Sequence, residues 1–263
     1  MSPSSPLRAL ADDISDLSGG TREGILHLPD TATALVFRTT AAGASDLTVL
    51  GPRTRASYYV GKDLPVCLRI RLRPGTARSL LGLPVSELAD RVTPLADLWS
   101  APAGRLEARL AALGDNTDLI LKHLQAALHA RITAQAPADP ALGNLVLSAA
   151  AALSGSQPVH VSDLARRLAV SERHLRNVFT DSTGLPPKRF ARITRVRTVL
   201  TAGRAHPARW AQLAARAGYY DQSHMTADFH AMMGVPPAAF FTGRIPALQP
   251  CQGLPTAIGV RPG

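Results

Sequence analysis

The last third of the chain carries one residue pattern twice, and this repeat limits the folds open to that region. The segments Val161–Phe179 and Trp210–Phe229 each contain a Leu-Ala pair in a short helical pattern, a turn, and a second helical pattern ending in Phe. Each Phe precedes a glycine by five residues, at Gly184 and Gly234, and each glycine begins a Gly-x-Pro-Pro sequence. A repeat of this kind indicates two copies of one structural unit. We therefore predict two helix-turn-helix units in tandem.

The second helix of the first unit has the polar face that base recognition requires. Ser171 is suited to cap it, because its hydroxyl can accept a backbone N–H of the next turn. With Phe179 turned inward, Arg173, Arg176 and Asn177 point outward. Arg makes bidentate contacts to guanine and Asn to adenine in the major groove, so we expect these three residues to read bases. The alternative is a solvated polar face.

The second unit differs at its turn. Gly218 is expected to take a positive φ there, and one of Tyr219 and Tyr220 to close the core. Asp221 is suited to cap the following helix. The outward residues expected to face bases on this helix are Gln222, Ser223 and His224.

A basic helix over Pro187–Thr201 joins the two units and would fix the distance between them. Its apolar positions fall on one side, and its arginines lie largely on the other. Phosphate contacts position a protein on DNA without specifying sequence. The residues that we expect to make such backbone contacts are Arg189, Arg192 and Arg195.

The charge distribution agrees with a polyanion partner for this region. The chain carries a formal charge of +10, and residues 158–244 contain 13 Arg and Lys against five Asp and Glu. Residues 1–157 contain 15 against 14. A basic segment beside a near-neutral one suggests double-stranded DNA as the partner of the basic one. A merely soluble basic surface would give the same numbers.

Cysteine usage and hydropathy exclude several classes of protein. The two cysteines, Cys67 and Cys251, have no metal-ligand spacing and cannot form a disulfide framework. The first residues lack the basic and apolar regions of a signal peptide, and no apolar run approaches the length of a membrane span. We expect a soluble cytoplasmic protein without metal, cofactor or membrane partner.

Residues 1–133 have a different organisation and are expected to form a separate sensor or dimerisation domain. A short helix is predicted over Leu7–Leu17, followed by short β-type runs punctuated by turn residues. These runs, which predict a small antiparallel sheet or β-barrel, are Ile25–Leu28, Ala34–Thr39, Leu47–Leu50, Ser57–Val60 and Val66–Leu72. The helical segments expected after them are Pro74–Leu81, Ser86–Arg91 with Ser86 as its cap, Pro102–Leu113 and Thr117–Ile132.

The last of these helices bears on oligomeric state. Its leucines Leu121, Leu124 and Leu128 recur at helical spacing, so the stripe is either core or one side of a homodimer contact. Residues 134–139 then have the composition of a linker. Residues 140–244, opened by an apolar helix over Pro140–Leu153, form the predicted all-helical DNA-binding domain, and residues 245–263 a flexible tail. The fold class predicted for the whole chain is α+β.

At this level of detail the C-terminal residues resemble the AraC/XylS family of transcription regulators. The match is Ala214-x-x-x-Gly218-Tyr-x-Asp221-x-Ser223-x-Met225-x-x-x-Phe229, followed by Gly234-x-x-Pro237-x-x-Phe240. The resemblance covers about residues 140–244. It implies a sequence-specific DNA-binding regulator in which the first unit gives the stronger base readout, with RNA polymerase as a further partner. It also implies an N-terminal domain that binds a small effector or dimerises.

One departure from the family pattern concerns the second unit. Ala227 stands where relatives that read bases with this helix often have a long polar or basic side chain. The resemblance therefore implies that the second unit reads weakly or contacts mainly the DNA backbone.

Two other classes of function are weighed against this interpretation. An enzyme carrying a DNA-targeting module would need a catalytic group, but His27 has no partner in a His-x-His pattern and Cys67 lacks a multi-cysteine cluster, which leaves a small buried cysteine as the better interpretation. A DNA-binding protein without any ligand is the second alternative. The alternating strand 67–73 places Arg69 and Arg71 on one face, where they would suit an anionic effector or simply face solvent.

Overall fold

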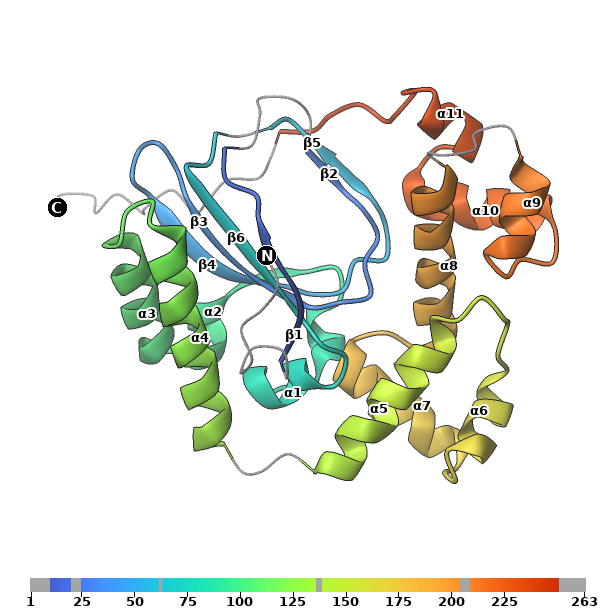
Figure 1. The fold of residues 1–263 in the computed structure, drawn as a ribbon, viewed down its shortest axis with the longest axis horizontal. Helices are drawn as coiled ribbons and strands as arrows, with labels where there is room; N and C mark the ends of the chain where they lie inside the picture. Colours follow the sequence, from blue (N-terminus) through green and yellow to red (C-terminus); the bar gives the residue numbers. More distant parts are fainter. Residues whose placement is uncertain (1–9, 20–24, 62, 136–138, 204–208, 251–263) are drawn as a thin grey trace, which may run out of the picture.

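The computed structural model places a β-sheet domain beside a helical domain, with α8 along the boundary between them (Figure 1). The residues that the structure describes are 10–19, 25–61, 63–135, 139–203 and 209–250. One hydrophobic core lies among the sheet and the helices before residue 135. A second core lies among the helices after residue 140. The predicted α+β class is confirmed.

The N-terminal part contains two antiparallel sheets. The strands are β1 (Ala11–Asp16), β2 (Ile25–His27), β3 (Ala34–Thr39), β4 (Ser45–Leu50), β5 (Ser57–Tyr59), β6 (Val66–Leu72) and β7 (Val92–Pro94). Five of them pair in the order β1-β6-β3-β4-β7, and β2 pairs with β5. The described strands do not join into a closed barrel, so of the two predicted arrangements the open sheet is the one that forms.

Alternation along β6 explains how the larger sheet acquires two chemically different faces. Leu68, Ile70 and Leu72 are each at most 1 % exposed and join the core. Arg69 and Arg71 lie between them on the opposite face and are partly buried. Successive side chains of a strand point to opposite faces, so this pattern follows from the sequence. The face with the arginines looks toward the two-stranded β2–β5 sheet (Figure 1).

The helix predicted over Leu7–Leu17 is wrong for the residues that the structure describes. Ala11–Asp16 forms strand β1, which pairs antiparallel with β6 from Ala11 opposite Leu72 to Asp16 opposite Leu68. Pairing with a distant strand overrides the weak local helical pattern. The remainder of that prediction, before residue 10, lies outside the described residues.

Short helices cover the apolar face of the sheet. They are α1 (Thr76–Leu81), η2 (Val85–Leu88), α2 (Leu95–Trp99), α3 (Ala101–Ala111) and α4 (Thr117–Ala134). The leucines Leu121, Leu124 and Leu128 of α4 are buried in this core, so the core interpretation of the stripe is confirmed. The helix predicted from Ser86 is a 3-10 turn that begins after Pro84 and has no side-chain cap.

The C-terminal part consists of helices, as predicted. They are α5 (Pro140–Leu153), α6 (Val161–Arg167), α7 (Glu172–Thr183), α8 (Pro187–Gly203), α9 (Trp210–Arg216), α10 (Gln222–Met233) and α11 (Pro237–Phe241). The sequence repeat is a structural repeat. The rings of Phe179 and Phe190 pack edge to face with their centroids 5.1 Å apart. Those of Phe229 and Phe240 pack in the same way with centroids 5.6 Å apart.

The segment after α11 is more ordered than a flexible tail. Gln249 forms a parallel bridge with Tyr59 at the edge of β5. Its N–H donates to the carbonyl of Tyr58 at 2.9 Å, and its carbonyl accepts from the N–H of Val60 at 2.9 Å. This correction holds for residues 245–250, because the rest of the predicted tail lies outside the described residues.

The two parts of the chain are in direct contact. The N–H of Ala56 donates to the carbonyl of Met232 at 2.7 Å, and the Tyr58 hydroxyl donates to the carbonyl of Met233 at 2.7 Å. Arg197 of α8 donates to the carbonyl of Pro29 at 3.0 Å. The contacts therefore join the β2–β5 sheet and its neighbouring loops to α8 and to the end of α10. Helix α7 also packs on η2 and α1.

Gly184 lies where this contact is tightest. It ends α7 with φ of 79°, and a Cβ built on it would lie 2.7 Å from the Pro52 side chain and 2.9 Å from the Val85 carbonyl. Gly234 occupies the same position in the second unit with φ of 76°, where a Cβ would meet only Pro246 at 3.3 Å. The two glycines thus share a conformation and differ in their surroundings.

We predict that Gly184→Ala destabilises the protein more than Gly234→Ala. Both variants place a Cβ in the left-handed region, which costs about 1–2 kcal/mol. Only the first also presses the Cβ against the backbone of the other part of the chain. The measurement is the free energy of unfolding in urea, with an expected extra loss of about 1 kcal/mol or more for Gly184→Ala. Equal losses would mean that Gly184 is not confined by the domain contact.

Candidate nucleic-acid interface

The first helix-turn-helix unit is α6, a tight turn and α7. Ala169 takes φ of 55° in the turn, and the N–H of Val170 donates back to the carbonyl of Ala165 at 3.0 Å. Ser171 caps α7 as predicted, accepting from the N–H of His174 at 3.1 Å. These bonds satisfy backbone groups that a helix end leaves free and fix the start of α7.

The two faces of α7 are sharply different. Leu175 and Phe179 are fully buried, whereas Arg173 and Asn177 are exposed, as the sequence predicted. Within the described residues neither of these exposed side chains has a hydrogen-bond partner. Arg176 is half-buried and forms an ion pair with Glu172, one turn earlier. The polar face of α7 therefore offers two free side chains beside one that is already oriented by its neighbour.

The second unit repeats the first with one additional residue. Gly218 takes φ of 77° in the turn, and the N–H of Tyr219 donates to the carbonyl of Ala214 at 2.9 Å, matching the bond made by Val170. Asp221 then caps α10 by accepting from the N–H of His224 at 2.7 Å. Tyr219 is the tyrosine that closes the core, and the additional residue Tyr220 is 96 % exposed.

The outward face of α10 differs from that of α7. Gln222, Ser223 and His224 are exposed, as predicted. The His224 ring packs edge to face on Tyr219 with centroids 5.2 Å apart. Around the small Ala227 side chain lies a hollow of about 390 Å³ that Gln222 and Ser223 also line. The face is polar at its start and recessed in its middle.

Sequence reasoning missed Asp228, a buried acid between the two units. Its carboxylate accepts from Arg192 of α8 at 2.6 Å, and its other oxygen lies 3.8 Å from Nε2 of His224. The Asp228 side chain is 7 % exposed and that of Arg192 is 44 % exposed. A signal was available, because position 228 lies on the inward stripe that includes Met225, Phe229 and Met232, where an acid needs a partner.

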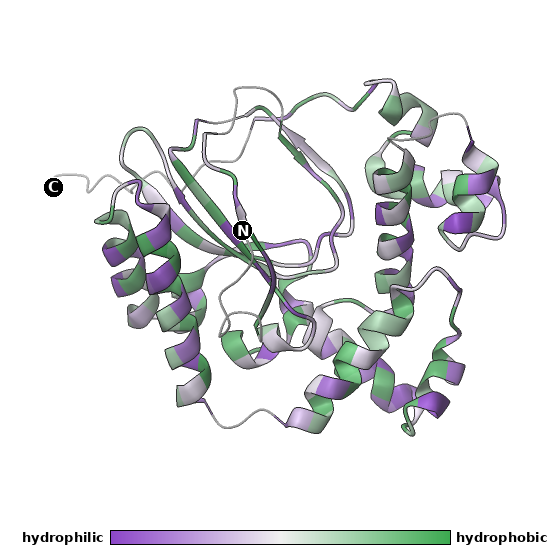
Figure 2. Ribbon diagram, viewed as in Figure 1, coloured by the Kyte–Doolittle hydropathy of each residue, from purple (hydrophilic) through white to green (hydrophobic). Residues whose placement is uncertain are grey.

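The three arginines of α8 predicted to contact phosphates have different surroundings. Arg192 is bound to Asp228, and this pair raises the pKa of the Arg192 guanidinium. Arg195 packs over the ring of Tyr219, with its guanidinium carbon 4.9 Å from the ring centroid. Arg189 is exposed and lines a cavity shared with the N-terminal part. Figure 2 shows hydrophilic and hydrophobic residues alternating along the ribbon of α8.

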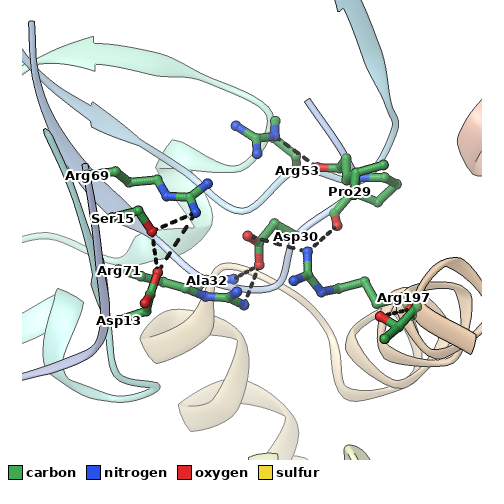
Figure 3. Close-up of polar contacts among 11 residues, drawn as sticks. Asp13, Ser15, Pro29, Asp30, Ala32, Arg53, Arg69, Arg71 and Arg197 are labelled. Atoms are coloured by element: carbon green, nitrogen blue, oxygen red, sulfur yellow. Dashed lines mark hydrogen bonds and ion pairs between the residues drawn. The ribbon is translucent and has the colours of Figure 1, made fainter. Parts of the chain in front are cut away.

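The arginine face of β6 is paired rather than free. Arg71 donates to Asp30 at 2.6 Å, and Arg197 approaches the other oxygen of Asp30 at 3.6 Å, so arginines from both parts of the chain converge on one carboxylate (Figure 3). Arg69 donates to the Ser15 hydroxyl at 3.2 Å. The Nε of Arg69 is buried without a hydrogen-bond partner among the described residues. This cluster also reaches Arg53, which lies beside Asp30 (Figure 3).

Two groups weighed as catalytic lie next to these arginines. Burial, followed by the charges of Arg53, Arg38 and Arg69, lowers the pKa of His27 to about 4. Burial raises the pKa of the Cys67 thiol, which keeps it in the weakly reactive protonated form. In the described part of the chain, no cluster of three metal-ligating side chains is found, and no helix is long and apolar enough to span a membrane.

We predict that Asp228→Asn lowers the free energy of unfolding by about 1–2 kcal/mol. Breaking a buried pair is costly, and the figure is reduced here because Arg192 is half exposed to solvent. The matched control is Asp163→Asn, which removes the exposed pair with Arg166 and should change stability by less than about 0.5 kcal/mol. Urea unfolding of both variants measures the difference. Similar losses would show that the Asp228 pair contributes no more than a surface pair.

We predict that His27 makes the protein less stable as the pH falls from 6.5 toward 4. The unfolded chain takes up a proton on His27 in this window, whereas the folded chain does not, because the pKa of His27 is lowered to about 4. The free energy of unfolding should therefore fall by about 1.4 kcal/mol per pH unit from this residue. Urea unfolding across the window should show a shallower slope for His27→Gln. A slope in His27→Gln equal to that of the parent protein would contradict the assignment to His27.

Comparison with known proteins agrees with this geometry. Residues 164–243 match the family model described as a helix-turn-helix domain. No curated protein matches the sequence.

Three of the similar solved structures are as follows. An AraC-type DNA-binding protein from Chromobacterium violaceum is 16 % identical, over 40 % of this chain and 96 % of that one, with a TM-score of 0.36. The DNA-binding domain of AdpA in complex with a target DNA is 24 % identical, over 40 % and 93 %, with a TM-score of 0.35. ToxT from Vibrio cholerae O395 is 11 % identical, over 89 % and 98 %, with a TM-score of 0.40.

These TM-scores are low, so the assignment rests on the family match, on the signature residues from Ala214 to Phe240, and on the repeated geometry of α6–α7 and α9–α10. Residues 164–243 therefore form a helix-turn-helix domain, and their signature residues resemble those of AraC-type transcription regulators.

Proposed function

We propose that the protein recognises specific double-stranded promoter DNA by inserting α7, and to a lesser extent α10, into successive major-groove segments. The observation that carries this proposal is the exposed start of both helices, each capped in the same way and held by the shared core around α8. Recognition helices of helix-turn-helix proteins contact base edges with their N-terminal residues. The expected target is an asymmetric site with two short segments about 10 bp apart.

We assign direct base readout chiefly to α7. Arg173 and Asn177 are exposed and free of competing bonds within the described residues, which supports their pairing with guanine and adenine. Arg176 would have to share its guanidinium between Glu172 and a base. Such a pair orients the side chain before binding, at the cost of weakening one contact to gain another.

The second unit is assigned a weaker role in base readout. Gln222, Ser223 and His224 are available on α10, but Ala227 leaves a recess in the middle of the same face. A methyl group can contact only an apolar base edge such as that of thymine. Tyr220, exposed at the turn, is in a position to add a contact to the sugar-phosphate backbone.

We also propose phosphate contacts on α8. The three candidate residues differ in how well they are placed to make them: Arg189, Arg192 and Arg195. Arg192 and Arg195 are held by Asp228 and Tyr219 and would present a fixed positive charge beside the second unit. Arg189, on the cavity shared with the N-terminal part, is the weakest candidate of the three. Long-range attraction by the basic domain supports all three without requiring direct bonds.

We propose a regulatory role for the N-terminal part, with effector binding or homodimerisation as its two forms. An effector that reaches Arg69 and Arg71 has to displace or join Asp13 and Asp30, which already pair with them. The burial of the α4 leucines removes the apolar stripe that motivated a dimer contact, so a dimer would need another surface. RNA polymerase is the partner expected of a transcription regulator. We place the protein in the cytoplasm and assign it no catalytic activity.

We predict that Arg173→Ala and Asn177→Ala each weaken binding to the preferred site by about 1–3 kcal/mol and relax preference at one base pair. The site is first obtained by selecting DNA fragments with the pure full-length protein. Binding is then measured at fixed salt, with Arg105→Ala on the exposed side of α3 as the control that removes one positive charge elsewhere. If the control weakens binding as much as the α7 variants, the effect is general electrostatics and α7 does not read the site.

A further inference from the structure

Beyond the DNA-binding faces, the structure contains a strongly basic cavity at the boundary between the two parts of the chain. Its volume is about 510 Å³, within the range of about 300–1,000 Å³ typical of small-molecule sites. Both sheets contribute to its wall, through Leu50 and Val92 on one side and Ser57 and Tyr59 on the other. It therefore occupies the gap that remains because the two sheets do not close into a barrel.

Four arginines line this cavity. Arg53, Arg55 and Arg91 come from the N-terminal part, and Arg189 comes from the start of α8. Among the described residues, the side chains of Arg55, Arg91 and Arg189 make no hydrogen bond or ion pair. An unpaired arginine is ordinary on a surface, but three from separate segments around one cavity concentrate positive charge in a recess.

The acid that lines the cavity, Asp90, offsets only one of these four positive charges. Asp90 accepts from the N–H of Thr54 at 2.7 Å and from its hydroxyl at 2.6 Å, so both carboxylate oxygens are engaged in holding the loop. Asp90 takes φ of 58°, a conformation rare for a residue other than glycine, and these bonds to Thr54 help to hold it. The cavity wall thus contains four guanidinium groups against one occupied carboxylate.

Arg53 adds a buried component to the site. Its Nε donates to the carbonyl of Leu28 at 3.2 Å, which leaves the end of the guanidinium available. Burial lowers the pKa of Arg53; Asp30 opposes this effect, and the nearby Arg69 and Arg197 add to it. Arginine nevertheless keeps its proton in proteins, so Arg53 stays a partly buried cation that a bound anion would stabilise.

We propose that this cavity binds a small oxyanion carrying at least two negative charges, a phosphate or a polycarboxylate, through Arg53, Arg55, Arg91 and Arg189. Guanidinium groups match both kinds of anion with paired N–H donors. The hydroxyls of Ser57 and Tyr59 would bind less charged parts of such a molecule. The site adjoins the Arg69 and Arg71 face through Arg53, but the acids of that face already pair with Arg69 and Arg71.

The position of Arg189 gives the ligand a consequence for regulation, and this part rests on the proposed DNA-binding function. Arg189 lies on α8, one turn from Arg192, which holds the second helix-turn-helix unit through Asp228. An anion shared by Arg189 and the three N-terminal arginines would strengthen the contact between the two parts. Binding of the anion itself requires nothing of the DNA-binding function.

The test is calorimetric titration of the full-length protein, without DNA, with pyrophosphate and separately with citrate at matched ionic strength. We expect one site per chain for at least one probe. Arg55→Gln, Arg91→Gln and Arg189→Gln should each weaken its binding about tenfold or more, as the loss of one charged hydrogen bond does. Three separate exposed positions keep the test decisive if one variant fails to fold. Pyrophosphate alone would identify a phosphate ligand, and citrate alone a polycarboxylate.

Two matched controls locate the binding. Arg105→Gln removes the same charge from α3, away from the cavity, and Arg173→Gln removes it from the DNA-binding face; neither should change the affinity. Absence of a stoichiometric site for either probe, or equal weakening by a control, would overturn the proposal. Loss of binding in Arg173→Gln alone would place the anion on the proposed DNA-binding face of α7 and would overturn the proposal. Because DNA is absent throughout, failure of the anion site leaves the proposed DNA-binding function untouched.

Discussion

Packing of helix α8 is the constraint on which the rest of the molecule depends. Ile193, Val196 and Val199 are fully buried in the core that both helix-turn-helix units share, so the separation of α7 and α10 is set by one helix. A packed core tolerates little displacement, because lost contacts and cavities each cost free energy. The polar side of the same helix extends this control. Arg192 holds α10 through Asp228, and Arg197 reaches Asp30 in the N-terminal part. A shift of α8 would disturb the shared core, the Arg192–Asp228 pair and the Arg197–Asp30 pair together.

The two units share a scaffold but differ in chemistry, and the difference begins at one residue. Tyr220 has no counterpart in the first unit, and the turn accommodates it by exposing it fully. Beyond the turn, α7 presents unpaired polar side chains, whereas His224 on α10 is packed on Tyr219 and faces Asp228. Two units with the same packing can therefore differ in the role of their second helix. The first unit presents unpaired polar side chains on α7, and the second is held to α8 through the Asp228–Arg192 pair.

Local patterns in the sequence were sufficient wherever a feature depends on nearby residues. The alternation of β6, the caps Ser171 and Asp221, and the glycine at position 218 all follow from period and backbone stereochemistry. Features that depend on distant partners were not predictable in this way. Strand β1 exists because β6 offers it a free edge, and the arginines of α8 separate according to what lies opposite each of them. Periodicity indicates which face of a helix is polar, but it cannot name the partner.

Near-neutral net charge in the N-terminal part conceals an uneven arrangement. Its acids are used in local pairs, Arg38 with Asp46, Arg71 with Asp30 and Arg73 with Asp12, and Asp90 is used to hold Thr54. Arg55 and Arg91, which have no acid partner among the described residues, lie at the boundary with α8, where Arg189 adds a further positive charge. Coupling between two parts requires an element whose position both of them bias. The N-terminal part touches the DNA-binding domain on α7, α8 and α10 but leaves the starts of α7 and α10 exposed. Any influence on DNA recognition must therefore act through the relative position of these helices and not by covering the residues proposed to contact bases.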